Sequence, residues 1–129
     1  MKAFASSLSP AVSPTGMQMA FAFSRTQADE LQYGIAVLSV DDLAVLKTLI
    51  VDIRLGTIYE RPTVQWSPDG QWLYYINYNS GVSNVWKVNV ADGSTLAVTN
   101  FKAGRVYNFA YNADGTKLAL ARGTGPRDR

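Results

Sequence analysis

A segment of ten residues occurs three times in this chain, and this repeat constrains the fold more than any other feature. The copies are residues 12–21, 66–75 and 111–120, and each has a large apolar residue, a turn that ends in glycine, and then an apolar run. The turn glycines lie 54 and 45 residues apart. A repeat of this length is typical of one supersecondary unit, which must stack against neighbouring units to bury its apolar face.

The turn of the middle copy shows why the three copies share the same pattern of residues. Proline at Pro68 fixes the backbone for the first corner, Asp69 bonds its own backbone, and Gly70 accepts a positive φ. The turn residues of the three copies are expected to be structural: Ser13, Pro14, Gly16, Ser67, Pro68, Asp69, Gly70, Asp114 and Gly115. A metal-binding role for the aspartates is the alternative, but no second cluster of oxygen ligands is evident near them.

Alternating and apolar runs between the turns predict short antiparallel strands. In the middle copy they are residues 63–66, 72–77, 85–90 and 96–101. In the first copy they are 17–24, 34–40 and 45–51, with an inner strand within 2–12 and the polar stretch 25–32 as a lengthened loop. A helix over 41–50 is the competing local prediction, and the repeat favours the strand. The third copy predicts strands at 106–111 and 117–121.

Repeats of this length with several strands each are typical of β-propeller blades. The sequence therefore predicts an all-β fold of two to three antiparallel four-stranded blades. The first covers about residues 1–51, the second about 62–101, and an incomplete third about 105–129. A closed ring needs about four or more blades, so we expect an open arc or a fragment of a larger propeller that self-associates through its open blade edges.

The residues that the chain lacks restrict its chemistry. Among 129 residues there is no cysteine and no histidine, which removes disulfides, the usual zinc sites and Ser-His or Cys-His nucleophile pairs. A net charge of +2 is too small to imply a nucleic-acid partner. We interpret Arg122, Arg127 and Arg129 as a frayed basic end. No secretory signal or membrane span is evident, so we expect a soluble segment, cytoplasmic or periplasmic according to its parent protein.

No catalytic residue is predicted, and neither a cofactor nor a metal. Nothing in the sequence brings Asp52 and Glu60 together as the carboxylate pair of a glycosidase. Ser67 has no histidine to activate it. The Gly-x-Gly at residues 123–125 is not followed by a helix that would complete a phosphate loop. We therefore expect that this segment is not an enzyme.

The candidate binding residues lie in loops. In a propeller, the loops from an outer strand to the next inner strand share one face with those that join the second and third strands. A mixture of aromatic and charged residues on that face suits a protein or peptide partner, with a small ligand as the alternative and a solvated loop without a partner as another. The residues are Glu60, Arg61, Tyr78, Asn79, Lys102, Arg105 and Tyr107.

The middle copy also resembles a known family. Residues 66–75, followed by 84–88 and by Asp92-Gly93, resemble the WD-like repeat of TolB-like propellers, and the resemblance extends over residues 12–122. The runs 99–102, 109–111 and 118–124 are similar to the last blades of propellers behind bacterial serine/threonine kinases or winged-helix regulators. This resemblance implies the sensor or interaction part of a larger bacterial signalling protein.

Two other functions stay open. One is the propeller of a prolyl-oligopeptidase-like hydrolase whose catalytic domain is absent from this sequence. The other is a free-standing structural piece that closes only by forming oligomers.

Overall fold

The computed structural model describes residues 5–6, 10–51, 53, 64–79 and 81–123. In this part of the chain it has eleven strands and no helix. The strands are β1 Ala5–Ser6, β2 Ala11–Val12, β3 Gln18–Gln27, β4 Glu30–Ser39, β5 Val45–Ile50, β6 Gln65–Trp66, β7 Trp72–Asn79, β8 Val82–Asn89, β9 Thr95–Ala97, β10 Arg105–Tyr111 and β11 Leu118–Gly123. They form three separate antiparallel sheets, as the all-β prediction requires.

The first sheet has the order β1-β3-β4-β5, and β2 also pairs with β3. The inner strand that was predicted within residues 2–12 is therefore divided into two short pieces along one edge of β3. β1 pairs with the end of β3 near Ser24, and β2 pairs with the beginning of β3 near Met19.

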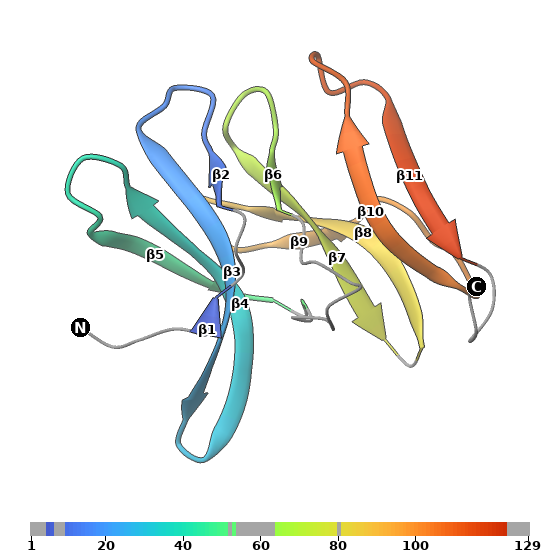
Figure 1. Cartoon of the computed structure of the whole chain (residues 1–129), viewed down its shortest axis with the longest axis horizontal. Coiled ribbons are helices and arrows are strands. Elements are labelled where there is room, and N and C mark those ends of the chain that lie inside the picture. Colours follow the sequence, from blue (N-terminus) through green and yellow to red (C-terminus); the bar gives the residue numbers. More distant parts are fainter. Residues whose placement is uncertain (1–4, 7–9, 52, 54–63, 80, 124–129) are drawn as a thin grey trace.

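The prediction of a lengthened loop at residues 25–32 was wrong. The strands β3 and β4 continue through this stretch as a regular ladder to the pair Gln27 and Glu30. A two-residue turn joins them, in which Ala28 and Asp29 have φ of 52° and 64°. Two successive positive φ angles match the right-handed twist of the strands, so the polar residues extend a hairpin that projects below the other sheets (Figure 1).

Residues 45–50 form the strand β5 and not the competing helix. The chain reverses after β4 at Leu43, which has a φ of 59°, and Leu43 N–H donates to the carbonyl oxygen of Ser39 at 2.9 Å. β5 then pairs with β4 and buries Leu49 between sheets. Pairing along a sheet edge outweighs the weak helix propensity of this segment.

The second sheet has the order β6-β7-β8-β9, and the third contains β10 and β11. The outer strand of the second sheet is shorter than the predicted 96–101, because it ends at Ala97. The next two N–H groups, of Val98 and Thr99, both donate to the carbonyl oxygen of Val85, at 2.8 and 3.1 Å. Because these two N–H groups share one acceptor, the chain leaves the β8–β9 ladder at this point.

The three sheets stand side by side (Figure 1), and an apolar layer fills each of the two spaces between them. Ile35 and Leu73 are fully buried in the layer between the first and second sheets. Val85 and Phe109 are buried in the layer between the second and third. Side chains also link the inner strands: Trp66 Nε1 donates to the carbonyl oxygen of Ala11 at 2.8 Å.

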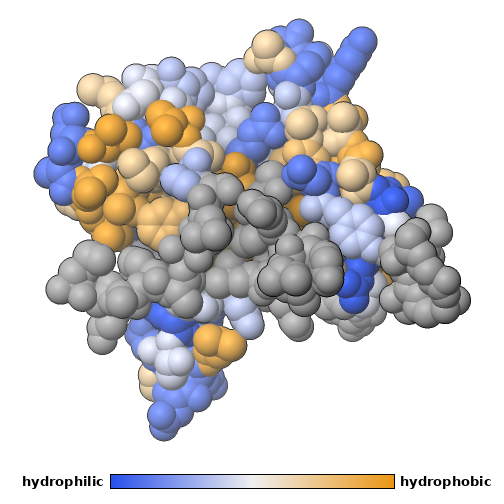
Figure 2. All heavy atoms as spheres, viewed as in Figure 1, coloured by the Kyte–Doolittle hydropathy of each residue, from blue (hydrophilic) through white to orange (hydrophobic). Residues whose placement is uncertain are grey.

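Apolar side chains also reach the surface over β5 (Figure 2), where Val45, Leu46 and Ile50 are exposed. Self-association through the blade edges stays a prediction from the sequence.

Candidate protein-binding surface

The turns and connections that the structure describes lie at two opposite ends of the sheets. The β2–β3, β6–β7 and β10–β11 turns lie at one end, which we call the turn end (upper in Figure 1). The β3–β4 and β7–β8 turns lie at the other, which we call the loop end, and the β9–β10 connection reaches β10 there. The loop end is the face on which the sequence placed the candidate binding residues.

The β9–β10 connection, residues 98–104, is held against β8 by one buried serine. Ser83 is 2% exposed. Its N–H donates to the carbonyl oxygen of Gly104 at 3.2 Å, and its Oγ accepts a hydrogen bond from the N–H of Val106. The second and third sheets are therefore joined at the point where β10 begins.

A neighbouring asparagine holds the first half of the same loop. Asn84 Oδ1 accepts hydrogen bonds from Phe101 N–H and from Thr99 Oγ1, and Asn84 Nδ2 donates to the carbonyl oxygen of Phe101 at 3.2 Å. Thr99 Oγ1 in turn accepts a hydrogen bond from Val85 N–H at 2.9 Å. Side chains thus supply the bonds that the shortened β9 no longer makes, and the loop has one defined path.

Arg122 belongs to this loop and not to a frayed end, so that interpretation was wrong. Its guanidinium carbon lies 3.6 Å from the centre of the Phe101 ring, which is a cation–π contact. Its Nη2 donates to the carbonyl oxygen of Ala103 at 2.6 Å. The sequence showed only a basic cluster; the partners lie about twenty residues away and meet Arg122 through the β10–β11 pairing. Arg127 and Arg129 lie outside the described residues.

The structure places three of the predicted binding residues at the loop end. Lys102 is exposed in the held loop, while Arg105 and Tyr107 are half-buried at the beginning of β10. Tyr107 occupies an irregularity between the pairs formed by Val106 and Asn108. Of the remaining four residues, Tyr78 and Asn79 end β7 and only their backbone is described, whereas Glu60 and Arg61 lie outside the described residues.

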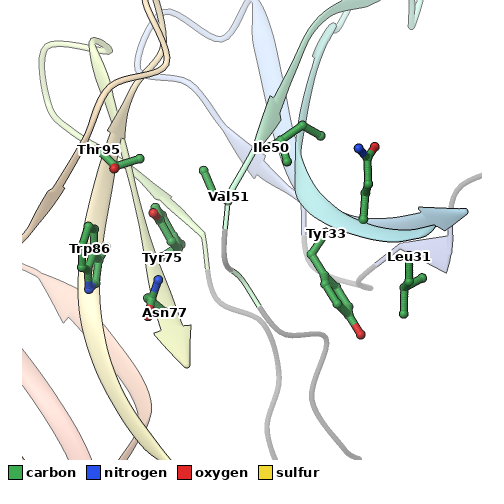
Figure 3. A pocket seen from close by; sticks show the side chains of 9 residues that line it. Leu31, Tyr33, Ile50, Val51, Tyr75, Asn77, Trp86 and Thr95 are labelled. Atoms are coloured by element: carbon green, nitrogen blue, oxygen red, sulfur yellow. The ribbon is translucent and has the colours of Figure 1, made fainter. Parts of the chain in front are cut away.

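A groove of about 500 Å³ between the first two sheets was not predicted (Figure 3). It is formed by facing side chains of both sheets, and the described residues that line it are Leu31, Gln32, Tyr33, Ile50, Val51, Tyr75, Asn77, Trp86 and Thr95. Sequence reasoning assigned Trp86 to the core and Leu31 to a loop. The one sequence feature that could have indicated the groove was the greater length of the first repeat.

The predicted turn residues lie at the turn end, and the same hydrogen bond closes all three turns. In each, the glycine N–H donates to the carbonyl oxygen three residues earlier, over 2.9 to 3.0 Å; the pairs are Gly16 with Ser13, Gly70 with Ser67, and Gly115 with Asn112. The three glycines have φ between 74° and 78°. Residues of this conformation carry a steric cost for any side chain with a Cβ.

The turn aspartates are used within their own turns. Asp69 Oδ1 accepts hydrogen bonds from Ser67 Oγ at 2.6 Å and from Gln71 N–H at 3.0 Å. These two bonds lower the pKa of Asp69 from its ordinary value. Asp114 accepts equivalent bonds from the Thr116 hydroxyl and N–H, which lower its pKa in the same way. Nor do the described residues contain a group of three or more acidic side chains suited to a metal ion.

Successive turns contact one another, which makes a pair of alanine substitutions informative. A Cβ on Gly115 would lie 2.9 Å from the ring of Pro68, whereas one on Gly70 would lie 3.9 Å from that of Pro14. Both positions share the left-handed backbone, which costs about 1–2 kcal/mol for a residue with a Cβ. We expect Gly115→Ala to lower the free energy of unfolding by about 1 kcal/mol more than Gly70→Ala, as measured by urea denaturation.

Exchange of Pro68 provides the control for this comparison. The double variant Pro68→Ala/Gly115→Ala is expected to lose the excess cost, because the ring atoms that meet the new Cβ are gone. Equal costs for Gly70→Ala and Gly115→Ala would show that the two turns are not in contact.

One tyrosine pair lies between the second and third sheets. The rings of Tyr74 and Tyr111 are 4.1 Å apart between centroids. Burial, and secondarily the neighbouring Tyr74, raises the pKa of Tyr111 to about 12. Tyr111 therefore stays protonated near neutral pH and acts as a packing residue.

Three antiparallel sheets side by side, with inner strands linked, equivalent turns at one end and apolar layers between them, are the arrangement of consecutive β-propeller blades. The structure describes no helix long and apolar enough to cross a membrane.

Comparison with known proteins identifies the kind of propeller. No protein-family model matches the chain. Tol-Pal system proteins TolB from Francisella tularensis subsp. mediasiatica (strain FSC147) and subsp. holarctica (strain LVS) are each 33% identical to it over 67 residues. That alignment covers 52% of this chain and 15% of each relative, so the chain matches only a small part of their length.

Solved structures show the same fold along almost the whole chain. TolB from Acinetobacter baumannii superposes with a TM-score of 0.73 at 21% identity, over 98% of this chain and 29% of that one. The β-propeller domain of the Trilobed protease from Pyrococcus furiosus has a TM-score of 0.62 at 17% identity, over 93% and 34%. Pyrococcus horikoshii acylaminoacyl peptidase has a TM-score of 0.63 at 16% identity, over 92% and 17%. The chain has a TolB-like β-propeller fold.

Proposed function

We propose that this chain is a non-catalytic segment of a β-propeller that binds a protein partner through its loop end. The observation that carries the proposal is the held loop at residues 98–104. Ser83, Asn84 and Arg122 bond its backbone, while Lys102 remains exposed. A loop that is ordered before binding loses little conformational entropy when a partner arrives.

The relatives support a role in binding. The curated ones are proteins of the Tol-Pal system, and the chain shares its fold with TolB. The wider context that the sequence resemblance implied, the sensor end of a bacterial signalling protein with a kinase or a winged-helix regulator, remains a prediction to which these relatives add no support.

A second candidate is the propeller of a prolyl-oligopeptidase-like hydrolase. It is favoured by the superposition on the Trilobed protease propeller and on acylaminoacyl peptidase. The coding sequence beyond residue 129 distinguishes the two candidates, because a following hydrolase domain contains a Gly-x-Ser-x-Gly nucleophile turn.

Selection of displayed random 12-residue peptides on the immobilised chain tests the binding proposal. The selected peptides are expected to bind the chain saturably in calorimetry. The double variant Lys102→Ala/Arg105→Ala is expected to weaken them about tenfold, since each tenfold change corresponds to about 1.4 kcal/mol. Gln71→Ala/Lys117→Ala alters two exposed residues of the turn end and serves as the matched control.

The proposal fails in either of two ways. If no selected peptide binds saturably, the binding role is wrong. If the turn-end control weakens binding while the loop-end variant does not, the assigned face is wrong.

A further inference from the structure

The first sheet carries a line of apolar residues across one of its faces, which we call the apolar row. Successive cross-strand partners in β2, β3, β4 and β5 form it: Val12, Met19, Leu38 and Val45. Their side chains therefore lie on the same face. Val12 is 58% exposed and Val45 is 43% exposed, while Met19 and Leu38 are half-buried. Large apolar side chains that meet solvent together mark a surface for contact with another molecule.

The second sheet shows what a row in this position does. Its equivalent residues are also successive cross-strand partners: Trp66, Leu73, Val88 and Thr95. Trp66 lies four residues before its turn glycine and Leu73 three residues after it, as Val12 and Met19 do in the first repeat. Trp66, Leu73 and Val88 are buried in the layer between the second sheet and the first. The apolar row is thus the same kind of surface, but no further sheet of the described residues covers it.

Small residues of the first sheet share the layer that buries the row of the second. Ala20 and Ala22 of β3 belong to this layer, and both are 0% exposed. Ala119 and Ala121 of β11 hold the same positions after the turn glycine of the third repeat, and both are exposed. Leu120 between them packs toward the second sheet, so these two alanines lie on the opposite face of β11. We call them the alanine face, which is equivalent to the surface that receives a neighbouring sheet inside the chain.

The contacts between turns run in one direction along the stack. Pro68 lies beside Gly115, and the proline of the first turn lies beside the glycine of the second. At the two ends this series is incomplete. A Cβ on Gly16 would meet no atom within 4 Å, and Ala113, which takes the place of the proline in the third turn, is exposed. The turn of the first sheet therefore has room for a neighbour on the same side as the apolar row.

The first and third sheets stand at the two ends of the stack (Figure 1), and their outer faces complement each other. We propose that the alanine face of one copy of this chain receives the apolar row of a second copy, head to tail. The second copy is the occupant because each chain carries both halves of a contact that it already makes between its own first and second sheets. In this arrangement Ala113 lies beside Gly16 of the second copy and continues the series of turn contacts.

The contact is heterologous, because the two copies use different surfaces. Two copies of three sheets supply six sheets, within the range of about four to eight blades in propellers, so two such contacts can close a ring. The association uses the faces of the end sheets and not the blade edges that the sequence suggested. It also goes beyond the proposed function, since the loop end stays free for a partner.

Sedimentation velocity of the whole chain over about a hundredfold range of concentration tests the association, which must follow mass action. The parent chain is expected to form species of two or more copies at the upper end. Ala119→Glu/Ala121→Glu blocks the alanine face, and Val12→Glu/Val45→Glu blocks the apolar row. Each variant alone is expected to associate at least about tenfold more weakly, because glutamates without a partner would be buried in the contact.

A mixture of the two blocked variants distinguishes the head-to-tail contact from any symmetric one. Each variant keeps the half that the other lacks, so an equimolar mixture is expected to form a 1:1 complex with an affinity within about threefold of the parent's. Formation of this complex also shows that both variants are folded. Leu31→Glu is the matched control: Leu31 is 58% exposed, as Val12 is, but lies on the projecting hairpin, and the variant is expected to associate like the parent.

Three results would overturn the proposal. They are a parent chain that is monomeric at every concentration, a blocked variant that associates by itself as strongly as the parent, and a mixture that gives no complex. The proposed function has a separate readout. If the parent is monomeric while the selected 12-residue peptides still depend on Lys102 and Arg105, the head-to-tail contact is wrong and the binding role stands.

Discussion

Gly34→Ala is expected to lower the free energy of unfolding by about 3 kcal/mol, at the upper end of the usual cost of overpacking. A Cβ at this position would overlap the backbone carbonyl oxygen of Leu49 and lie 2.9 Å from the Phe23 ring. A backbone atom of a paired strand cannot rotate away as a side chain does. Equilibrium urea denaturation, followed by far-UV circular dichroism, measures the loss.

Two further variants separate the cause from other effects of glycine substitution. Gly81→Ala introduces a Cβ into open space at a φ of +84° and is expected to cost about 1–2 kcal/mol from the backbone alone. Phe23→Leu/Gly34→Ala removes the ring contact but leaves the Leu49 carbonyl in place. We expect this double variant to recover less than half of the loss. Full recovery would show that the aromatic ring, and not the β4–β5 pairing, requires glycine.

The second large effect is expected for Leu73→Ala, which is predicted to cost about 3 kcal/mol within the 2–5 kcal/mol range of such truncations. Leu73 is fully buried in the layer between the first two sheets. Its cross-strand partners are Trp66 and Val88, which also belong to that layer. Because this layer joins two blades, we expect a single cooperative transition at a lower urea midpoint with an unchanged slope.

Leu96→Ala is the matched control, since the same atoms are removed from a side chain that is 52% exposed. It is expected to change the free energy of unfolding by no more than about 0.5 kcal/mol. Similar costs for the two leucines, or two separate transitions in Leu73→Ala, would contradict a common core for the first and second blades.

Most of the strands could be read from the sequence because their signals are local. The turn Ser67-Pro68-Asp69-Gly70 contains its own hydrogen bonds, and the apolar run after it pairs with the next strand through a short connection. Recognition of the repeat also explains why residues 45–51 were assigned to a strand and not to a helix, and the structure has β5 there over Val45–Ile50. The order of the strands within a blade also predicted which loops share one face, and Lys102, Arg105 and Tyr107 lie at that loop end.

The errors and omissions share a different cause. Residues 25–32 were interpreted as a loop because they are polar, although both faces of a projecting hairpin meet water and need no apolar alternation. The role of Arg122 depends on Phe101 and Ala103, and the groove depends on β4 lying opposite β7 and β8. Contacts between residues so distant in the sequence cannot be predicted from a local sequence pattern.

The sequence by itself therefore determined the all-β class, the repeating blade and the turns that divide it, since backbone conformation at Pro and Gly and the alternation of apolar residues act over a few positions. Only the tertiary structure decided where the inner strand divides into β1 and β2, how Ser83 and Asn84 hold the β9–β10 loop, and where a groove opens between two blades. These features arise from packing between sheets that are distant in the chain, and packing selects among local alternatives that are nearly equal in free energy.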